Sequence, residues 1–228
     1  MKLGDRTLKS IFRSVGVDQV MAQTAIAEVV NTIDQAEKRF GLSRNISQDF
    51  FQEWHVDLPE ITTSDRDSLK VLWNRYIYHR SNGQLLESTA MLLLVSPLLT
   101  MAGFYDSPFL IKAEESVRIT ISDSEEILQG RIDVLVLLEY LWVIVLESKK
   151  TMLSVWSALP QALAYTMANP NLEKAVYVVL TNGDDLVFVK VENKKYAFSR
   201  VFSPLVSNID LENILQILRK LGTLAIKS

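Results

Sequence analysis

Two acidic residues and a lysine in the middle of the chain have the spacing of a catalytic cluster: Asp133, Glu147 and Lys149. Between the two acids, residues 134–146 hold two runs rich in Val, Leu and Ile, which is the composition of buried strands. A hairpin that turns at residues 139–141 sets Asp133 opposite Glu147 at its open end, with Cβ atoms about 5 Å apart. Lys149 then shares a face with Glu147, because side chains alternate along a strand.

This arrangement predicts a metal site. Two facing carboxylates repel each other, and burying them without a partner costs several kcal/mol. A divalent cation removes that cost, and Mg²⁺ is the natural candidate because it prefers hard oxygen ligands and keeps several waters. Lys149 beside a metal-bound water can help to deprotonate it, or can stabilise charge that develops on an attacked phosphate. The alternative interpretation is a charged strand end on a solvent-facing hairpin.

The residues around the two acids resemble a known nuclease motif. Gly130-Arg131-Ile132-Asp133, followed by Val-Ile-Val-Leu-Glu-Ser-Lys at residues 143–149, resembles the catalytic core of the PD-(D/E)xK nuclease superfamily. The likeness is greatest to the N-terminal nuclease domain of type I restriction enzyme R subunits, with its pattern G-R-x-D followed by E-x-K. One departure is Ile132, which stands where the superfamily's name has proline.

The resemblance implies a Mg²⁺-dependent DNA endonuclease, with Mn²⁺ as a substitute metal. Asp133 and Glu147 would hold the metal, together with the carbonyl of Ser148, and Lys149 would orient or activate the attacking water. Glu87 precedes an apolar helix and is the candidate third acidic ligand by resemblance. An acid favoured by the helix dipole at a helix start is the other interpretation of Glu87.

A second motif follows the first. Gln161 and Tyr165 are four residues apart, and therefore lie on one face of the helix expected there. This Q-x-x-x-Y resembles the motif that follows E-x-K in many of these nucleases, where it lines the site. Gln161 would steady Lys149 or a phosphate, and Tyr165 would support the site.

The remaining elements are expected from patterns of apolar and turn residues. Helices are predicted over 8–40, from Thr62-Thr63-Ser64 onward, over 84–104 and over 211–221, and strands over 109–121, 175–180 and 186–191. Asn182-Gly183 marks a hairpin turn after the strand ending in Thr181, again as in R subunits. Asp184 and Asp185 are expected to be solvated turn residues rather than metal ligands.

These elements predict an α/β fold with a restriction-endonuclease-like core, in which helices flank a mixed central sheet. We expect the core over residues 81–228 and an N-terminal helical accessory region over residues 1–80. The uncharged segment 88–104 also suits a membrane span, but its length and its Ser, Thr and Gly content favour a helix buried against the sheet.

Composition narrows the classes of function. The 228 residues carry a net charge of −3, with pI near 5.5, so DNA binding by this chain alone should be weak. The absence of cysteine excludes disulfides and cysteine nucleophiles, and with no signal peptide it favours the cytoplasm. His55 and His79 lack metal-site spacing, and no phosphate-binding loop or helicase motor motif is present.

Two other functions stay open beside the nuclease. A nuclease-fold module without activity could serve as a DNA-binding or assembly subunit, and an unrelated α/β domain could carry the charges by coincidence. The expected partners are DNA and subunits of a restriction-modification system, with no membrane association. A homodimer is one assembly that stays open.

Overall fold

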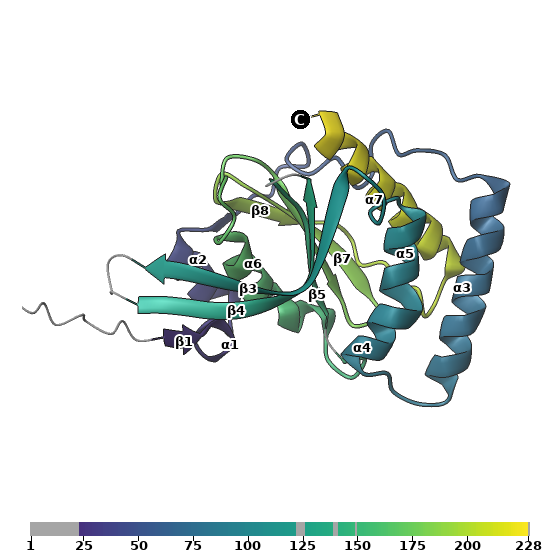
Figure 1. The fold of residues 1–228 in the computed structure, drawn as a ribbon, viewed down its shortest axis with the longest axis horizontal. Coiled ribbons are helices and arrows are strands. Elements are labelled where there is room, and N and C mark those ends of the chain that lie inside the picture. The colour runs from purple at the N-terminus through teal and green to yellow at the C-terminus, as the bar shows by residue number, and fades with distance from the viewer. Residues whose placement is uncertain (1–22, 122–125, 139–140, 149, 228) are drawn as a thin grey trace, which may run out of the picture.

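The computed structural model describes residues 23–121, 126–138, 141–148 and 150–227, with the backbone alone at residue 121 and at residues 141–148. In this part of the chain, eight strands form one mixed sheet that carries helices on both faces (Figure 1). The predicted α/β fold with a mixed central sheet flanked by helices is confirmed, and its arrangement is consistent with the expected nuclease-like core.

The sheet order is β3-β4-β5-β6-β7-β8-β2, with β1 placed beside β4. β5 pairs with β6, β1 with β4 and β2 with β8 in parallel, and the other neighbours are antiparallel. The strands are β1 (Gln23–Ala25), β2 (Ser43–Arg44), β3 (Phe109–Ile121), β4 (Glu126–Leu138), β5 (Leu141–Ser148), β6 (Val176–Thr181), β7 (Leu186–Glu192) and β8 (Lys195–Phe198).

β4 changes its partner along one edge. One edge of β4 pairs with β3 from one end to the other, so β1 and β5 must both lie along the opposite edge of β4. β1 pairs with residues 127–129 of β4, and β5 begins its pairing where Val134 faces Leu146. The predicted hairpin register holds from Val134 to Val136 and shifts beyond that residue. The predicted turn includes Glu139 and Tyr140, which lie outside the described residues.

Two hydrophobic cores cover the two faces of the sheet. In β6, Tyr177 and Val179 enter one core, whereas Val176, Val178 and Leu180 enter the other, as a strand buried on both faces requires. The first core holds α3 (Thr63–Ser81), the π-helical segment η1 (Met91–Val95), α5 (Ser96–Met101) and α7 (Asn208–Lys227). The second holds α1 (Ile26–Val29), α2 (Ile33–Phe40), the 3₁₀ segment η2 (Val155–Ala158) and α6 (Leu159–Thr166).

The helix boundaries follow local signals. Thr62 caps α3 in a reciprocal arrangement with Asp65, at the predicted start of that helix. Gly41 ends α2 with φ of 66°, a left-handed conformation that suits glycine. The predicted helix over 84–104 runs from α4 (Glu87–Ala90) through η1 and α5, with a π-helical turn before Pro97. Proline cannot donate a helical hydrogen bond and crowds the preceding turn, which accounts for the irregularity.

None of the helices that the structure describes has the length and apolar content needed to cross a membrane. The apolar segment instead packs into the first core through Leu94, Val95, Leu98 and Leu99.

The predicted helix over 8–40 is confirmed only in part: within its described residues, the strand β1 is followed by the two short helices α1 and α2, and Thr32 caps the second of them. The strands β1 and β2 in the first 80 residues were not predicted. β1 and β2 come from this region and pair with β4 and β8 of the central sheet. They have three and two residues, which is too short for an alternating pattern. The part of the predicted helix that precedes residue 23 lies outside the described residues. The division near residue 80 stays a prediction.

The prediction for Asp184 is wrong. Its side chain is not solvated: the residue is only 8% exposed, and its carboxylate accepts hydrogen bonds from Tyr76 and Arg80 of α3. Asp185, with its backbone N–H bonded to Asn182 Oδ1, stays in the predicted turn. The guanidinium offsets the cost of burying the Asp184 charge.

Candidate active site

Asp133 lies where β3 and β4 bend. Leu128 and Ile132 enter one core and Val134 and Val136 enter the other, so the alternation along β4 breaks at Asp133. Glu114 of β3 faces Asp133, because the residues on either side of Glu114 pair with the residues on either side of Asp133. The φ of Glu114 is 54°. Figure 1 shows both strands curving sharply in this region. The bend leaves Asp133 partly buried rather than within either core.

Gln161 and Tyr165 of α6 contact each other, as their spacing predicts. Gln161 Nε2 donates a hydrogen bond to the Tyr165 hydroxyl. The backbone N–H of Arg131, two residues from Asp133, also donates to this hydroxyl, at 3.4 Å. Arg131 lies between the part of β4 that pairs with β1 and the part that pairs with β5. The second predicted motif is thereby fixed to the backbone of the first.

Gly130 explains why the two motifs fit together. A Cβ atom at residue 130 would lie 2.3 Å from Cε1 of Tyr165 and 3.1 Å from Cδ1 of Ile26. Carbon atoms that are not bonded prefer a separation of about 3.5–4.0 Å. The tyrosine ring can therefore lie against β4 only because residue 130 has no side chain. The contact ties the glycine of G-R-x-D to the tyrosine of Q-x-x-x-Y.

Glu147 and Ser148 are placed by their backbone. β5 continues beside β6 beyond the last pair with β4, with Glu147 opposite Leu180 and Ser148 opposite Thr181. The pair of β4 and β5 nearest to the open end is Val134 with Leu146, so Asp133 and Glu147 are the next positions on each strand. Lys149 lies outside the described residues, and the position of the Glu147 side chain is likewise not described.

Glu87 is the first residue of α4 and is partly buried. The segment before it is bonded to the segment that follows the E-x-K motif. Leu85 N–H donates to the hydroxyl of Thr151 at 3.2 Å, and Thr151 N–H donates to the Leu85 carbonyl at 3.4 Å. Sequence analysis missed this buried threonine, because nothing local indicates a partner so far away in the chain. The contact brings the start of α4 to the end of β5.

The other acidic residues and histidines considered in the sequence form ion pairs or ring contacts with neighbouring side chains. Glu114 is exposed and pairs with Arg131 at 3.4 Å, and Glu115 pairs with Lys112 at 2.8 Å. His55 packs against Trp54 and His79 against Tyr78, in agreement with the expectation of surface or packing roles. Among the described side chains no three acids or histidines form a group that could hold a metal, but Glu147 is not among those side chains.

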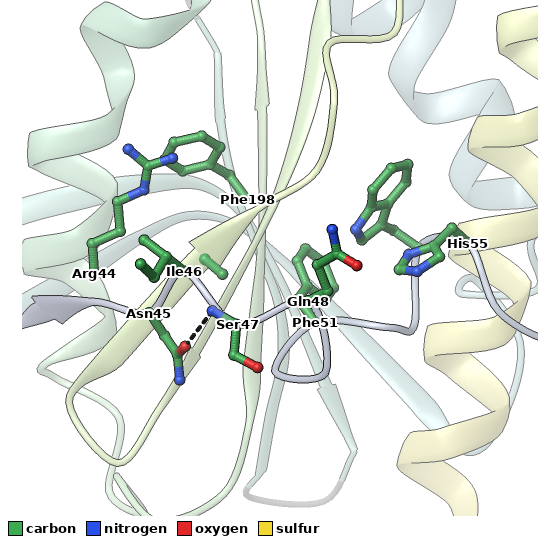
Figure 2. Close-up of a pocket in the computed structure, with 10 residues that line it drawn as sticks. Arg44, Asn45, Ile46, Ser47, Gln48, Phe51, His55 and Phe198 are labelled. Atoms are coloured by element: carbon green, nitrogen blue, oxygen red, sulfur yellow. Dashed lines mark hydrogen bonds between the residues drawn. The ribbon is translucent and has the colours of Figure 1, made fainter.

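A cavity of about 400 Å³ lies beside β2 and β8, at the edge of the sheet away from β4 and Asp133. Figure 2 shows Arg44, Ile46 and Phe198 on one side of it and His55 on the other, with Gln48 and Phe51 between them. The Arg44 guanidinium lies 4.2 Å from the centre of the Phe198 ring. None of the predicted site residues lines this cavity.

Comparison with known proteins gives little further information. No protein-family model and no curated protein matches the sequence. Among solved structures, the chain is similar to a fragment assigned as an HsdR subunit of a type I restriction enzyme from Vibrio vulnificus YJ016, with a TM-score of 0.40 and 18% identity. The match covers 58% of this chain and 25% of the Vibrio chain. A similarity of this strength carries no weight for the function.

Proposed function

We propose that the chain is a Mg²⁺-dependent DNA endonuclease of the kind found in type I restriction enzyme R subunits. The observation that carries the proposal is the register of the β4–β5 hairpin. Pairing begins at Val134 and Leu146, so the two acids of the motif are the next residues on adjacent strands. Neighbouring positions on paired strands are close enough for two carboxylates to share one cation.

In this proposal Asp133 and Glu147 hold the metal, with the Ser148 carbonyl and Glu87 as further ligands. The bonds between Leu85 and Thr151 support the role of Glu87, because they bring its helix to the end of β5. Bound Mg²⁺ would neutralise the acids and lower the pKa of a coordinated water. Lys149 would orient or activate that water for attack on the phosphodiester bond.

Gln161 and Tyr165 would complete the site from the α6 side. The hydrogen bond from Arg131 N–H to the Tyr165 hydroxyl supports this role, since it fixes the helix two residues from Asp133. Gln161 would then be held by the same hydroxyl, in a position to steady Lys149 or a phosphate.

The net charge of −3 indicates that the chain alone binds DNA weakly. Proteins that bind DNA tightly by themselves neutralise many phosphates with basic residues. We propose that other subunits of a restriction-modification system, or a second copy of the chain, supply part of the DNA affinity in the cytoplasm. The same acidity favours the alternative function, a nuclease-fold module that binds DNA or assembles complexes without cleaving.

The first test is cleavage of plasmid DNA by wild type and Asp133→Asn in Mg²⁺, Mn²⁺ or EDTA. Asn keeps the shape of the side chain but removes the charge that binds the metal. We expect metal-dependent cleavage by the wild type and a loss of at least about a hundredfold in the variant. Glu114→Gln is the matched control, because Glu114 is an exposed acid at the facing position on β3 and should keep activity.

A second pair of variants tests the lysine. Lys149→Ala should abolish cleavage, whereas Lys150→Ala should retain most of it, because Lys150 is exposed and has no part in the proposed site. Wild type that binds Mn²⁺ but cleaves no DNA with either metal would favour the non-catalytic module. Equal activity of Asp133→Asn and wild type would exclude the proposed site.

A further inference from the structure

We propose that the β6–β7 turn, Thr181-Asn182-Gly183-Asp184, and its partners Tyr76 and Arg80 on α3 form a positioning device for the candidate metal site. This inference rests on the proposed function and assigns a role to residues that contact neither metal nor DNA in it. The turn contacts the end of β5 and the last residue of α4, and so sets Glu147, Ser148 and Glu87 relative to one another.

Hydrogen bonds within the turn stabilise its conformation. The Thr181 hydroxyl donates to the Asp185 carbonyl at 2.8 Å and accepts from Gly183 N–H at 2.9 Å. Asn182 Oδ1 accepts from Asp185 N–H at 2.8 Å. Gly183 has φ of 90°, a conformation that other residues adopt only with strain. The side chains of the turn therefore stabilise its shape even without contacts to the rest of the molecule.

One side of the turn holds the residues that follow the E-x-K motif. Asn182 Nδ2 donates to the Leu153 carbonyl at 2.8 Å, and Thr181 pairs with Ser148 at the end of β5. A Cβ on Gly183 would lie 3.5 Å from Cγ2 of Thr151. The chain on both sides of Lys149 is thus attached to the same turn.

The same glycine touches the helix that carries Glu87. A Cβ on Gly183 would lie 3.0 Å from the Cβ of Ala90, the last residue of α4. Thr151 reaches the other end of this helix through its hydrogen bonds to Leu85. Both ends of α4 therefore contact the turn or its neighbour Thr151, whereas Asp133 belongs to β4.

A partly buried ion pair fixes the turn to α3. Arg80 Nε lies 2.9 Å from Asp184 Oδ1, and Arg80 Nη2 lies 3.0 Å from Oδ2, so the guanidinium binds both oxygens. The fully buried Tyr76 donates its hydroxyl hydrogen to Oδ1 at 2.8 Å. Burial and the hydrogen bond to Asp184 raise the pKa of Tyr76, and the hydrogen bond to Asp184 raises that of Arg80. Both groups keep their donor hydrogens at neutral pH.

Loosening the turn should therefore change metal binding more than DNA binding. The ligands on β5 and α4 would lose their common support, while Asp133 would stay on β4. Metal sites tolerate only small displacements of their ligands, so affinity for the cation should fall. Residues that contact DNA elsewhere would be unaffected.

The experiment compares Asp184→Asn with Asp65→Asn. Asp65 forms a similar ion pair with Arg219, bound through two nitrogens at 2.8 and 2.7 Å, and joins α3 to α7 instead of the turn. For Asp184→Asn we expect the Mg²⁺ concentration at half-maximal cleavage and the Kd for Mn²⁺ to rise about tenfold, with KM for DNA unchanged. Asp65→Asn should change both metal constants less than twofold.

Tyr76→Phe separates positioning from simple electrostatics, and it also serves if Asp184→Asn does not fold. It removes one hydrogen bond to Asp184 without changing a charge. A positioning role predicts weaker Mn²⁺ binding and faster amide hydrogen exchange over residues 85–90 and 150–153 in both Tyr76→Phe and Asp184→Asn. Faster exchange in these segments should not occur in Asp65→Asn.

The outcomes are distinct. Equal metal dependence in Asp184→Asn and Asp65→Asn overturns the inference and leaves the nuclease intact. An effect of Asp184→Asn without any effect of Tyr76→Phe also overturns it, in favour of a charge effect. Wild type that neither binds Mn²⁺ nor cleaves DNA removes the proposed function itself, and the inference with it.

Discussion

The contact between Gly130 and Tyr165 gives a quantitative prediction. In Gly130→Ala the new methyl group would lie 2.3 Å from Cε1 and 3.1 Å from Cζ of the tyrosine ring. Relief requires the ring to withdraw by about 1 Å, to reach the usual carbon separation. Tyr165 is 1% exposed, and its hydroxyl is bonded to Arg131 N–H and Gln161, so it has no free space to enter.

The expected cost follows from these contacts. Overpacking of a core typically costs about 1–3 kcal/mol. Replacing glycine by alanine returns up to about 1 kcal/mol, because the unfolded chain loses conformational freedom. We therefore expect Gly130→Ala to lower the free energy of unfolding by about 1–2 kcal/mol. For a chain of this size, the corresponding fall in Tm is about 2–8 °C.

Thermal and urea unfolding should be measured for Gly130→Ala in three backgrounds: wild type, Tyr165→Phe and Tyr165→Leu. Phenylalanine keeps the ring, so the cost should be unchanged, whereas leucine removes the ring and should relieve most of it. The comparison uses differences within each background, and so cancels the cost of the Tyr165 substitution itself. An equal cost in the leucine background would refute the proposed contact.

Three further predictions concern the stability of the fold. Gly41→Ala should lower the free energy of unfolding by about 1–2 kcal/mol in urea titrations, because residue 41 has φ of 66°. The hydrogen bond from Arg219 holds the pKa of Asp65 well below its usual range, so the stability difference between wild type and Asp65→Asn should be full at neutral pH and shrink below about pH 4. Burial and the hydrogen bond to Glu37 raise the pKa of Tyr196 to about 12, so the advantage of wild type over Tyr196→Phe should persist below about pH 10 and decline as pH rises further. Unfolding at a series of pH values measures both.

Several features were predictable because their signals are local. The two apolar runs and the acids at their ends indicated the register in which Val134 faces Leu146. Thr62 and Asp65 have the spacing of a capping box, and α3 begins there. The spacing of Gln161 and Tyr165 was enough to place them side by side on a helix.

Other features depend on residues far apart in the chain. Asp184 looked like a solvated turn residue, and only α3 shows why it is buried: Tyr76 and Arg80 reach it from more than 100 positions away. The break in alternation at Asp133 likewise depends on how β3 and β4 bend together, which no periodicity within β4 reveals. Motif resemblance named Gly130, but its physical reason, the ring of Tyr165, required the fold.

The pairing of β1 and β2 has a consequence for how the chain folds. Ser43 of β2 pairs with Lys195 of β8, and Gln23 of β1 pairs with Ile127 of β4. During synthesis from the N-terminus, both strands leave the ribosome long before their partners exist. Contacts between such distant segments form slowly, because closing a long loop costs entropy before the contact repays it. Until β8 is complete, Ala36 and Phe40 of α2 have no finished core to enter, and this is the period in which the nascent protein is most exposed to aggregation.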